Sequence, residues 1–218
     1  MTFRVTLDRP WLTLDFEAPQ RVLSWAVNRP GFVYTSQILW REVRNADLPE
    51  DLDVDDWLQH ELASISRTEA VVFLTSRDVR AFHDVTTEVE GVRARCVATV
   101  GLSNAERVGA RVDRRGKDWG TINLVVHTDQ ALDHAAQLEA MAIAVQARTV
   151  GILEVGLSLP SGYATGTGTD CIAVAATRGD TRYAGLHTAL GEAIGQSVLA
   201  AVSKGAVEWM EKVRREEI

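Results

Sequence analysis

Residues 165–176 read Thr-Gly-Thr-Gly-Thr-Asp-Cys-Ile-Ala-Val-Ala-Ala, a run rich in glycine and threonine that passes directly into an apolar run. The first half cannot be a helix interior, because glycine costs about 1 kcal/mol there relative to alanine and threonine loses rotamer freedom. We therefore predict a loop over 165–170 and a strand over 172–176. The loop has two open interpretations: a turn that only begins a strand, or a loop that faces a ligand.

The same local pattern occurs earlier in the chain. Gly120-Thr121 opens a strand predicted over 120–127, and a helix predicted over 130–149 follows. Gly168-Thr169 likewise precedes a strand, and the chain then leads into a final helix predicted over about 188–215. We interpret this echo as a pairing of two β-α units rather than as a proven repeat.

The first half of the chain is dominated by predicted strands. They cover 3–16 (two short strands around a turn at 8–10), 21–27, 31–40, 70–75 and 89–100 (with a turn at 90–91), and they are joined by a helix over 55–65 and a short helix over 77–82. Many strands before two long helices favour an α+β fold, in which a largely antiparallel or mixed β-sheet is layered with the two helices. We expect a single domain over 1–218, with 203–218 as the charged end of the last helix.

Composition excludes several classes of protein. The 218 residues are 46% hydrophobic and 24% charged, which is ordinary globular composition. A net charge of −7, without a stripe of Lys and Arg between aromatic residues, argues against a nucleic-acid partner. No stretch approaches the roughly 20 apolar residues of a membrane span, and no signal peptide is recognisable at the N-terminus. Cys96 and Cys171 are too far apart for a CxxC motif and are expected to be buried free thiols. We expect a cytoplasmic protein without a membrane partner.

Some polar residues suggest chemistry, each beside a plainer structural interpretation. His187 can act as a general acid or base or can simply cap a helix, and Glu192 can orient it or be solvated. Asn123, alone in an apolar strand, either braces a loop or faces the site, because an unpaired buried amide costs about 1–3 kcal/mol. No HxxxH or HExxH pair is present, so no protein-bound metal is expected. The loop over 165–170 lacks the Gly-Lys-Ser/Thr of a Walker-type phosphate loop.

Six segments, taken in order, are similar to the adenosylcobinamide amidohydrolase family of corrinoid salvage. They are Arg21–Ala26, Leu74–Val79, Gly101–Ala105, Gly120–Asn123, Ala164–Asp170 and Tyr183–Gly195. Any one of these motifs alone is weak evidence for the family, whereas six motifs in the same order are specific for it. The resemblance covers about residues 20 to 203.

The resemblance implies hydrolysis of the amide that joins the f-propionate of the corrin ring to aminopropanol. The products are adenosylcobyric acid, used in cobalamin salvage and remodelling, and 1-amino-2-propanol; related members also open corrinoids with an unsuitable lower base. The partner is then a corrinoid small molecule, and the cobalt enters as part of the substrate, with no protein cofactor. The alternative is a non-catalytic corrinoid-binding or delivery protein. Both a monomer and a homo-oligomer remain open.

Amide hydrolysis requires an activated nucleophile, a stabilised oxyanion and a proton for the leaving amine. We expect His187 to activate water or a hydroxyl, and Asp170 or Glu192 to hold its imidazole. Ser103 and Thr169 are candidate nucleophiles, and direct attack by water is equally open. The residues expected to bind the substrate, including backbone N–H donors for the oxyanion, are Asn104, Thr121, Asn123, Thr165, Gly166, Thr167, Gly168, Thr169 and Thr188.

Overall fold

The structure is a computed structural model that describes residues 3–44, 47–49, 51–113 and 119–216. Its main strands are β1 (Phe3–Asp8), β2 (Trp11–Ser24), β3 (Gly31–Glu42), β4 (Val71–Thr75), β5 (Phe82–Val89), β6 (Val92–Val100), β8 (Ile122–Thr128) and β12 (Cys171–Ala176). Four two-residue strands are β7 (Ala105–Glu106), β9 (Ser158–Leu159), β10 (Gly162–Tyr163) and β11 (Gly166–Thr167). The helices are α1 (Val54–Ser64), the 3-10 helix η2 (Val79–Ala81), α2 (His134–Val155) and α3 (Ala189–Glu216).

One large mixed sheet organises the chain. Its strand order is β4-β3-β2-β12-β8-β6-β5, with β1 paired to β2. The pairs β3–β4 and β8–β12 are parallel, and the other pairs are antiparallel. The predicted α+β class, with a mixed sheet and two long helices in the C-terminal half, is confirmed.

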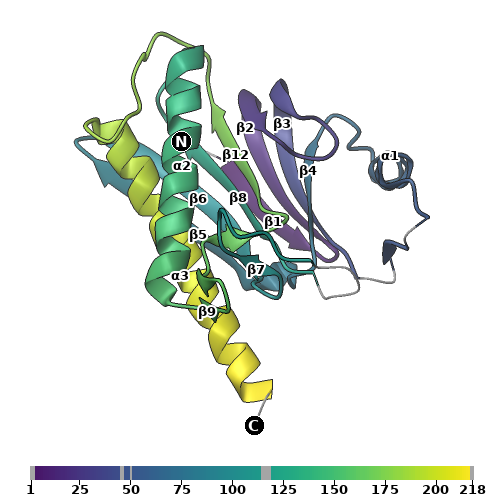
Figure 1. Cartoon of the computed structure of the whole chain (residues 1–218). Coiled ribbons are helices and arrows are strands. Elements are labelled where there is room, and N and C mark those ends of the chain that lie inside the picture. Colours follow the sequence, from purple (N-terminus) through teal and green to yellow (C-terminus); the bar gives the residue numbers. More distant parts are fainter. Residues whose placement is uncertain (1–2, 45–46, 50, 114–118, 217–218) are drawn as a thin grey trace.

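Helices α2 and α3 lie side by side across one face of the sheet (Figure 1). Alternation along β8 directs Leu124 and Val126 into the core that these helices cover, whereas Val125 belongs to the core of the opposite face. The side chain of Asp133 accepts a hydrogen bond from the N–H of Ala136 and caps α2, which ends at Gly156 in the left-handed conformation. The observed helix therefore begins and ends later than the predicted range of 130–149.

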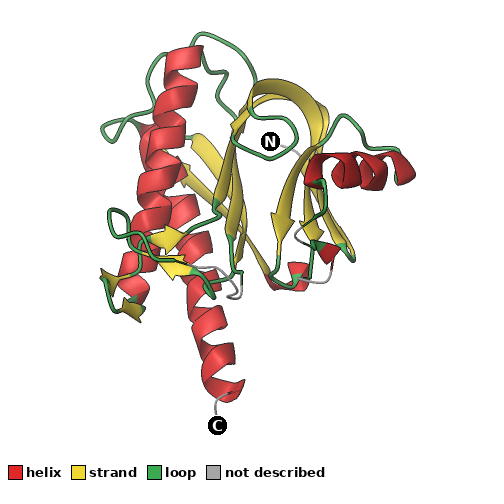
Figure 2. Ribbon diagram, turned by 45° about the vertical axis from the view of Figure 1, so that its right-hand side comes forward, coloured by secondary structure: helices red, strands yellow, loops and turns green. Residues whose placement is uncertain are grey.

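The opposite face of the sheet curls around a second core (Figure 2). There Ile38 and Phe73, from the β3–β4 side, pack in one cluster with Val125 and Ala173 from the centre of the sheet. Helix α1 covers the outside of β3 and β4, where its Leu58 and Leu62 form a third, smaller cluster with Leu39 and Val72. The curl leaves the ends of β4, β8 and β12 close together, and this arrangement positions the site described below.

The Gly-Thr echo corresponds to two adjacent parallel strands. Cys171 pairs with Asn123 at the start of β12 and β8. The same offset places Gly168 beside Gly120 and Thr169 beside Thr121, so the two Gly-Thr pairs precede neighbouring strands at the same edge of the sheet. The pairing inferred from the sequence is thus confirmed.

The structure differs from the sequence prediction at the hairpin β5–β6. Glu90 and Gly91 both have positive φ, 50° and 82°, which is typical of a two-residue hairpin turn. The predicted turn at 90–91 therefore joins two full strands, and the first of them, β5, was not predicted. Strand β5 forms one edge of the sheet and its burial alternates only between intermediate and exposed, so its apolar signal is weak. Residues 217 and 218 of the predicted charged helix end lie outside the described residues.

Candidate functional site

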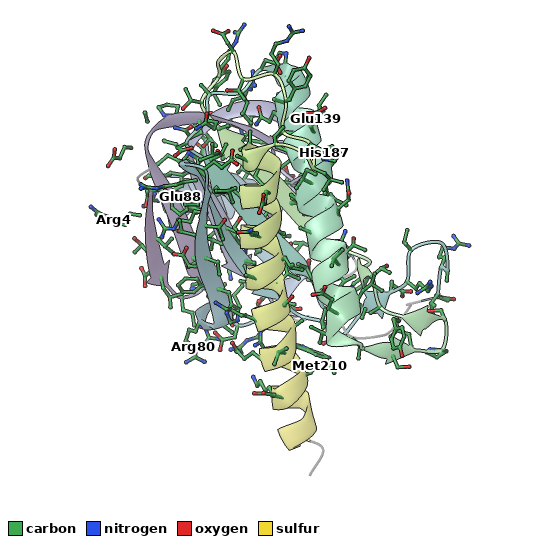
Figure 3. The ribbon with its side chains drawn as sticks, turned by 90° about the vertical axis from the view of Figure 1, so that its left-hand side faces the viewer. Arg4, Arg80, Glu88, Glu139, His187 and Met210 are labelled. Atoms are coloured by element: carbon green, nitrogen blue, oxygen red, sulfur yellow. The ribbon has the colours of Figure 1, made fainter. Side chains whose placement is uncertain are left out.

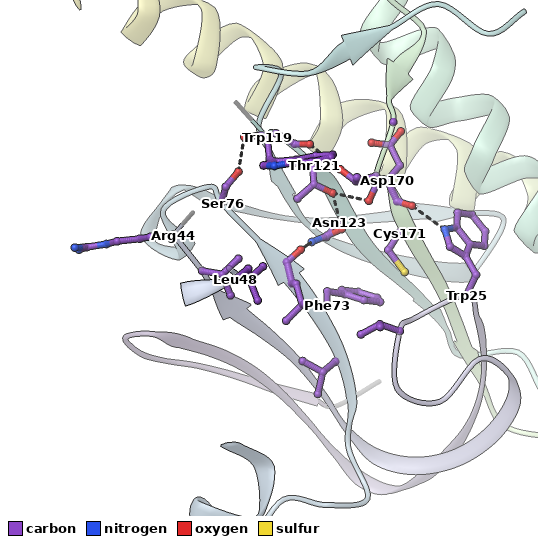
Figure 4. Close-up of a pocket in the computed structure, with 17 residues that line it drawn as sticks. Trp25, Arg44, Leu48, Phe73, Ser76, Trp119, Thr121, Asn123, Asp170 and Cys171 are labelled. Atoms are coloured by element: carbon purple, nitrogen blue, oxygen red, sulfur yellow. Dashed lines mark hydrogen bonds between the residues drawn. The ribbon is translucent and has the colours of Figure 1, made fainter. Parts of the chain in front are cut away.

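A cavity of about 1000 Å³ opens where the ends of β4, β8 and β12 meet the loop after β3 (Figure 4). This volume is at the upper end of the range of about 300–1,000 Å³ that is common for small-molecule sites. One wall is apolar and consists of Val27, Val43, Leu48, Val72, Phe73 and Leu74. The cavity can therefore receive a large ligand with an extended apolar face.

Two tryptophans border the cavity with half of their surface exposed. Trp25 is 46% exposed and Trp119 is 54% exposed, and Figure 4 shows the two indoles at different sides of the opening. The indole N–H of Trp25 donates a 2.7 Å hydrogen bond to the carbonyl of Asp170, and the hydroxyl of Ser76 donates to the carbonyl of Trp119 at 2.8 Å. Trp119 directly precedes the Gly120-Thr121 pair, whereas Trp25 directly follows β2, and both line the cavity.

The two Gly-Thr pairs form the polar edge of the cavity. The hydroxyl of Thr121 lies 2.8 Å from the carbonyl of Thr169, and the hydroxyl of Thr169 donates to the carbonyl of Gly120 at 2.8 Å. Asn104 supports this edge from behind, since its amide donates to the Thr169 hydroxyl at 3.3 Å. Gly168 and Thr169 line the cavity, which favours the ligand-facing interpretation of the loop.

Backbone donors at this edge remain free. Within the part of the chain that the structure describes, the N–H groups of Gly168 and Thr169 donate to no acceptor. Two adjacent unpaired donors beside a cavity are suited to bind a carbonyl oxygen and the oxyanion formed from it.

The carboxylate of Asp170 is a brace rather than a free base. Its two oxygens accept hydrogen bonds from the N–H of Ile122 (3.1 Å) and from the hydroxyl and N–H of Thr167 (3.1 Å for the N–H), and Arg148 of α2 lies 2.9 Å away as an ion-pair partner. Burial raises the pKa of the Asp170 carboxyl above its ordinary value, and Arg148 is the strongest opposing influence. With every contact used to shape the loop, this carboxylate does not orient a histidine.

Asn123 combines both roles considered for it. Its amide N–H donates to the carbonyl of Leu74 at 2.7 Å and ties β8 to β4 across the curled face. Its amide oxygen lies 3.1 Å from the hydroxyl of Thr121, and the residue lines the cavity. Asn123 thus fixes the width of the cavity and contributes to its polar edge.

Several predicted binding residues lie behind the loop and not on the cavity. The hydroxyl of Thr165 accepts the N–H of Val108 at 2.7 Å, Thr167 bonds to Asp170, and Gly166 lies against Arg148. Ser103 is exposed and does not line the cavity, although its backbone lies beside Gly120. These residues shape the loop or its surroundings, and Thr169 is the one candidate nucleophile of the two that faces the cavity.

His187 lies at the other end of the molecule. The chain just before it is tied to Glu139, near the start of α2, by the N–H of Ala184 (2.7 Å), whereas the loop over 165–170 is tied to Arg148. These two anchors are about 14 Å apart along the helix axis. His187 is exposed, and Figure 3 shows it beside Glu139. The structure does not support the predicted pairing of His187 with Asp170.

Thr188 and Glu192 belong to the start of α3. The hydroxyl of Thr188 accepts the N–H of Gly191 at 2.9 Å and caps the helix. Glu192 is exposed and accepts a hydrogen bond from Gln196 at 3.0 Å. Neither residue lines the cavity, and helix capping accounts for the sequence pattern around His187.

Cys171 is a neutral thiol at the cavity wall. Burial raises its pKa to about 12, so it carries no thiolate at neutral pH. The described residues contain no group of three or more His, Cys, Asp and Glu side chains arranged to hold a metal ion. Among these residues, no helix is long and apolar enough to cross a membrane.

Comparison with known proteins relates this site to a family. The family model of CbiZ, adenosylcobinamide amidohydrolase, matches residues 2–214. No curated protein matches the sequence. Among solved structures, the PH0078 protein from Pyrococcus horikoshii OT3 is similar with a TM-score of 0.44 and 10% identity, over 92% of this chain and 76% of that chain. Since the family model spans nearly the whole sequence, the chain belongs to the adenosylcobinamide amidohydrolase family.

Proposed function

We propose that the protein hydrolyses the amide between the corrin f-propionate and aminopropanol of adenosylcobinamide. Water adds across the C–N bond, so the products are the carboxylate of adenosylcobyric acid and 1-amino-2-propanol, which leaves as an ammonium ion at neutral pH. The cobalt arrives within the substrate. The observation that carries this proposal is the large cavity with an apolar wall and a polar edge in a chain of this family.

The chemistry of the cavity suits a corrinoid. A corrin ring is wide, has apolar methyl-bearing faces and carries amide side chains around its rim. The apolar wall and the exposed indoles of Trp25 and Trp119 are complementary to such a face, and the hydroxyls and amides of the opposite edge are complementary to the rim. We place the scissile amide at this polar edge.

We assign the oxyanion to the N–H groups of Gly168 and Thr169, which find no other acceptor among the described residues. Loss of one such donor typically lowers turnover by about 10²–10³-fold. The cavity offers two nucleophiles, a water molecule and the hydroxyl of Thr169. When water attacks directly, it supplies the proton that the departing amine requires. When Thr169 attacks, its hydroxyl proton passes to the departing amine as the acyl ester forms, and water then hydrolyses the ester and restores the hydroxyl.

The direct test is incubation of the purified protein with adenosylcobinamide, followed by chromatography of both products. We expect adenosylcobyric acid and aminopropanol to appear in equal amounts, with many product molecules formed per protein molecule. Tight binding without release of aminopropanol would contradict the proposal and would indicate a corrinoid-binding or delivery protein.

We expect His187→Ala to change turnover by less than about twofold, because His187 is exposed and distant from the cavity, whereas a general acid–base contributes about 10²–10⁴-fold. Steady-state rates with adenosylcobinamide measure this, and circular dichroism checks the fold. A hundredfold loss in a folded variant would return His187 to the mechanism and contradict the site placement above.

We expect Trp25→Ala to weaken binding of adenosylcobinamide by about tenfold with a smaller effect on kcat, because an aromatic contact beyond simple burial contributes about 0.5–1.5 kcal/mol. Trp25→Phe should restore part of the affinity by returning an aromatic ring, although it cannot donate to Asp170. Isothermal titration calorimetry measures the affinities. Tyr183→Ala, which removes an exposed aromatic ring outside the cavity, is the matched control, and an equal loss in both variants would exclude a corrin contact at Trp25.

A further inference from the structure

Arg148 connects helix α2 to the back of the loop over 165–170. Its Nη1 donates to the carbonyl of Thr165 at 2.7 Å and lies 2.9 Å from Oδ2 of Asp170. The side chain is 14% exposed and does not line the cavity. One guanidinium nitrogen therefore holds both ends of the loop.

Gly166 shows how closely this guanidinium fits the loop. A Cβ atom at Gly166 would lie 1.8 Å from Nη1 of Arg148 and 2.6 Å from Oδ2 of Asp170. The guanidinium occupies the space that any side chain would need, so the loop and Arg148 are built around each other. In contrast, a Cβ at Gly168, on the cavity side, would meet no atom closer than 4.0 Å.

The other side of the loop is fixed by contacts at the cavity. The indole of Trp25 donates to the carbonyl of Asp170, and the hydroxyl of Thr121 contacts the carbonyl of Thr169. The loop is thus held between Arg148 behind it and these groups in front. Gly168 and Thr169 are its exposed residues, and their N–H groups donate to no acceptor among the residues that the structure describes.

We propose that Arg148 is a positioning residue for the amide hydrolysis: it holds the loop so that the N–H groups of Gly168 and Thr169 are directed at the scissile carbonyl. The inference rests on the proposed function. Arginine is suited to this task because it keeps its charge when buried and offers donors in a fixed fork. Without it, the Asp170 carboxylate would be buried beside hydrogen-bond donors but without its cation, which favours rearrangement of the loop.

The test compares Arg148→Lys and Arg148→Gln with the unaltered protein in steady-state assays on adenosylcobinamide. We expect kcat to fall at least about tenfold in Arg148→Lys and further in Arg148→Gln, because misdirected donors no longer stabilise the oxyanion. KM should change by less than about threefold, since the cavity wall is untouched. Lysine should rescue part of the loss because it restores the charge, although its shorter side chain does not reach both acceptors.

Arg41→Gln is the matched control. Arg41 is also 14% exposed and pairs with a glutamate, Glu61 at 2.7 Å, but it lies outside the cavity and packs between β3 and α1. Its loss should lower stability without lowering kcat. Normal kcat in both Arg148 variants, or a loss of kcat matched by Arg41→Gln at equal stability, would overturn the positioning role alone. Absence of turnover by the unaltered protein would overturn the proposed function and this role with it.

Discussion

Gly166→Ala is expected to lower turnover of adenosylcobinamide at least about a hundredfold. The added methyl group displaces Arg148 or the loop, and the N–H groups of Gly168 and Thr169 are then no longer directed at the oxyanion. A methyl group at this position would lie 1.8 Å from Nη1 of Arg148, far inside contact distance. Either the guanidinium or the loop has to move, and each movement breaks the contacts that hold Thr165 and Asp170. Steady-state kinetics together with thermal unfolding measure the effect on a folded protein.

A double-mutant cycle identifies the cause of that loss. If Gly166→Ala acts by expelling Arg148, then Arg148→Ala and the double variant should lose similar activity, so that the two changes are far from additive. Gly185→Ala is the matched control, since a Cβ there meets no atom within 4 Å and the residue lies outside the cavity. Additive losses, or full activity of Gly166→Ala, would contradict the coupling of the loop to α2.

The sequence predicts the part of the site that two equivalent Gly-Thr pairs form before neighbouring strands. Gly120-Thr121 and Gly168-Thr169 could be recognised as equivalent because each pair precedes an apolar strand, and parallel neighbours bring such pairs to the same edge. Thr121, Asn123, Gly168 and Thr169 were therefore predicted as site residues, and all four line the cavity.

His187 shows what such reasoning cannot resolve. The loops before and after β12 both carry polar residues that suit catalysis, but a strand of six residues separates their ends by about 16–20 Å. Direction along the strand decides which loop faces the cavity, and no local pattern encodes it. The polar residues around His187 instead belong to the start of α3, which Thr188 caps.

The opposite wall was missed for a different reason. Trp25 and Ser76 come from segments that carry no chemical motif, and only the curl of the sheet brings them to the cavity. The family resemblance could have indicated both residues, since they lie in two of the segments that carry it, Arg21–Ala26 and Leu74–Val79. Long-range curvature of a sheet depends on packing between distant strands, which a single sequence does not reveal.

The second large effect concerns stability and arises at His127 on β8. Its ring is 7% exposed, packs against Phe3 and Phe16 at centroid distances of 5.7 and 5.3 Å, and has no hydrogen-bond partner for Nδ1 among the described residues. Burial lowers its pKa from 6.5 to about 4; the nearby Asp129 opposes this shift, and Arg95 adds a smaller lowering effect. The folded protein therefore keeps this ring neutral where the unfolded chain would protonate it.

The sign of the pH dependence follows from this difference in proton binding. Between pH 6.5 and about 4 the unfolded chain binds more protons at His127, so the free energy of unfolding decreases as the pH falls. The contribution amounts to about 2 kcal/mol between pH 7 and pH 5. His127→Phe keeps an aromatic ring in the core and should remove this part of the decrease, measured by urea unfolding at both pH values. His60→Phe, at an exposed position on α1, should retain it; an equal decrease in the protein and in His127→Phe would show that other groups cause the acid sensitivity.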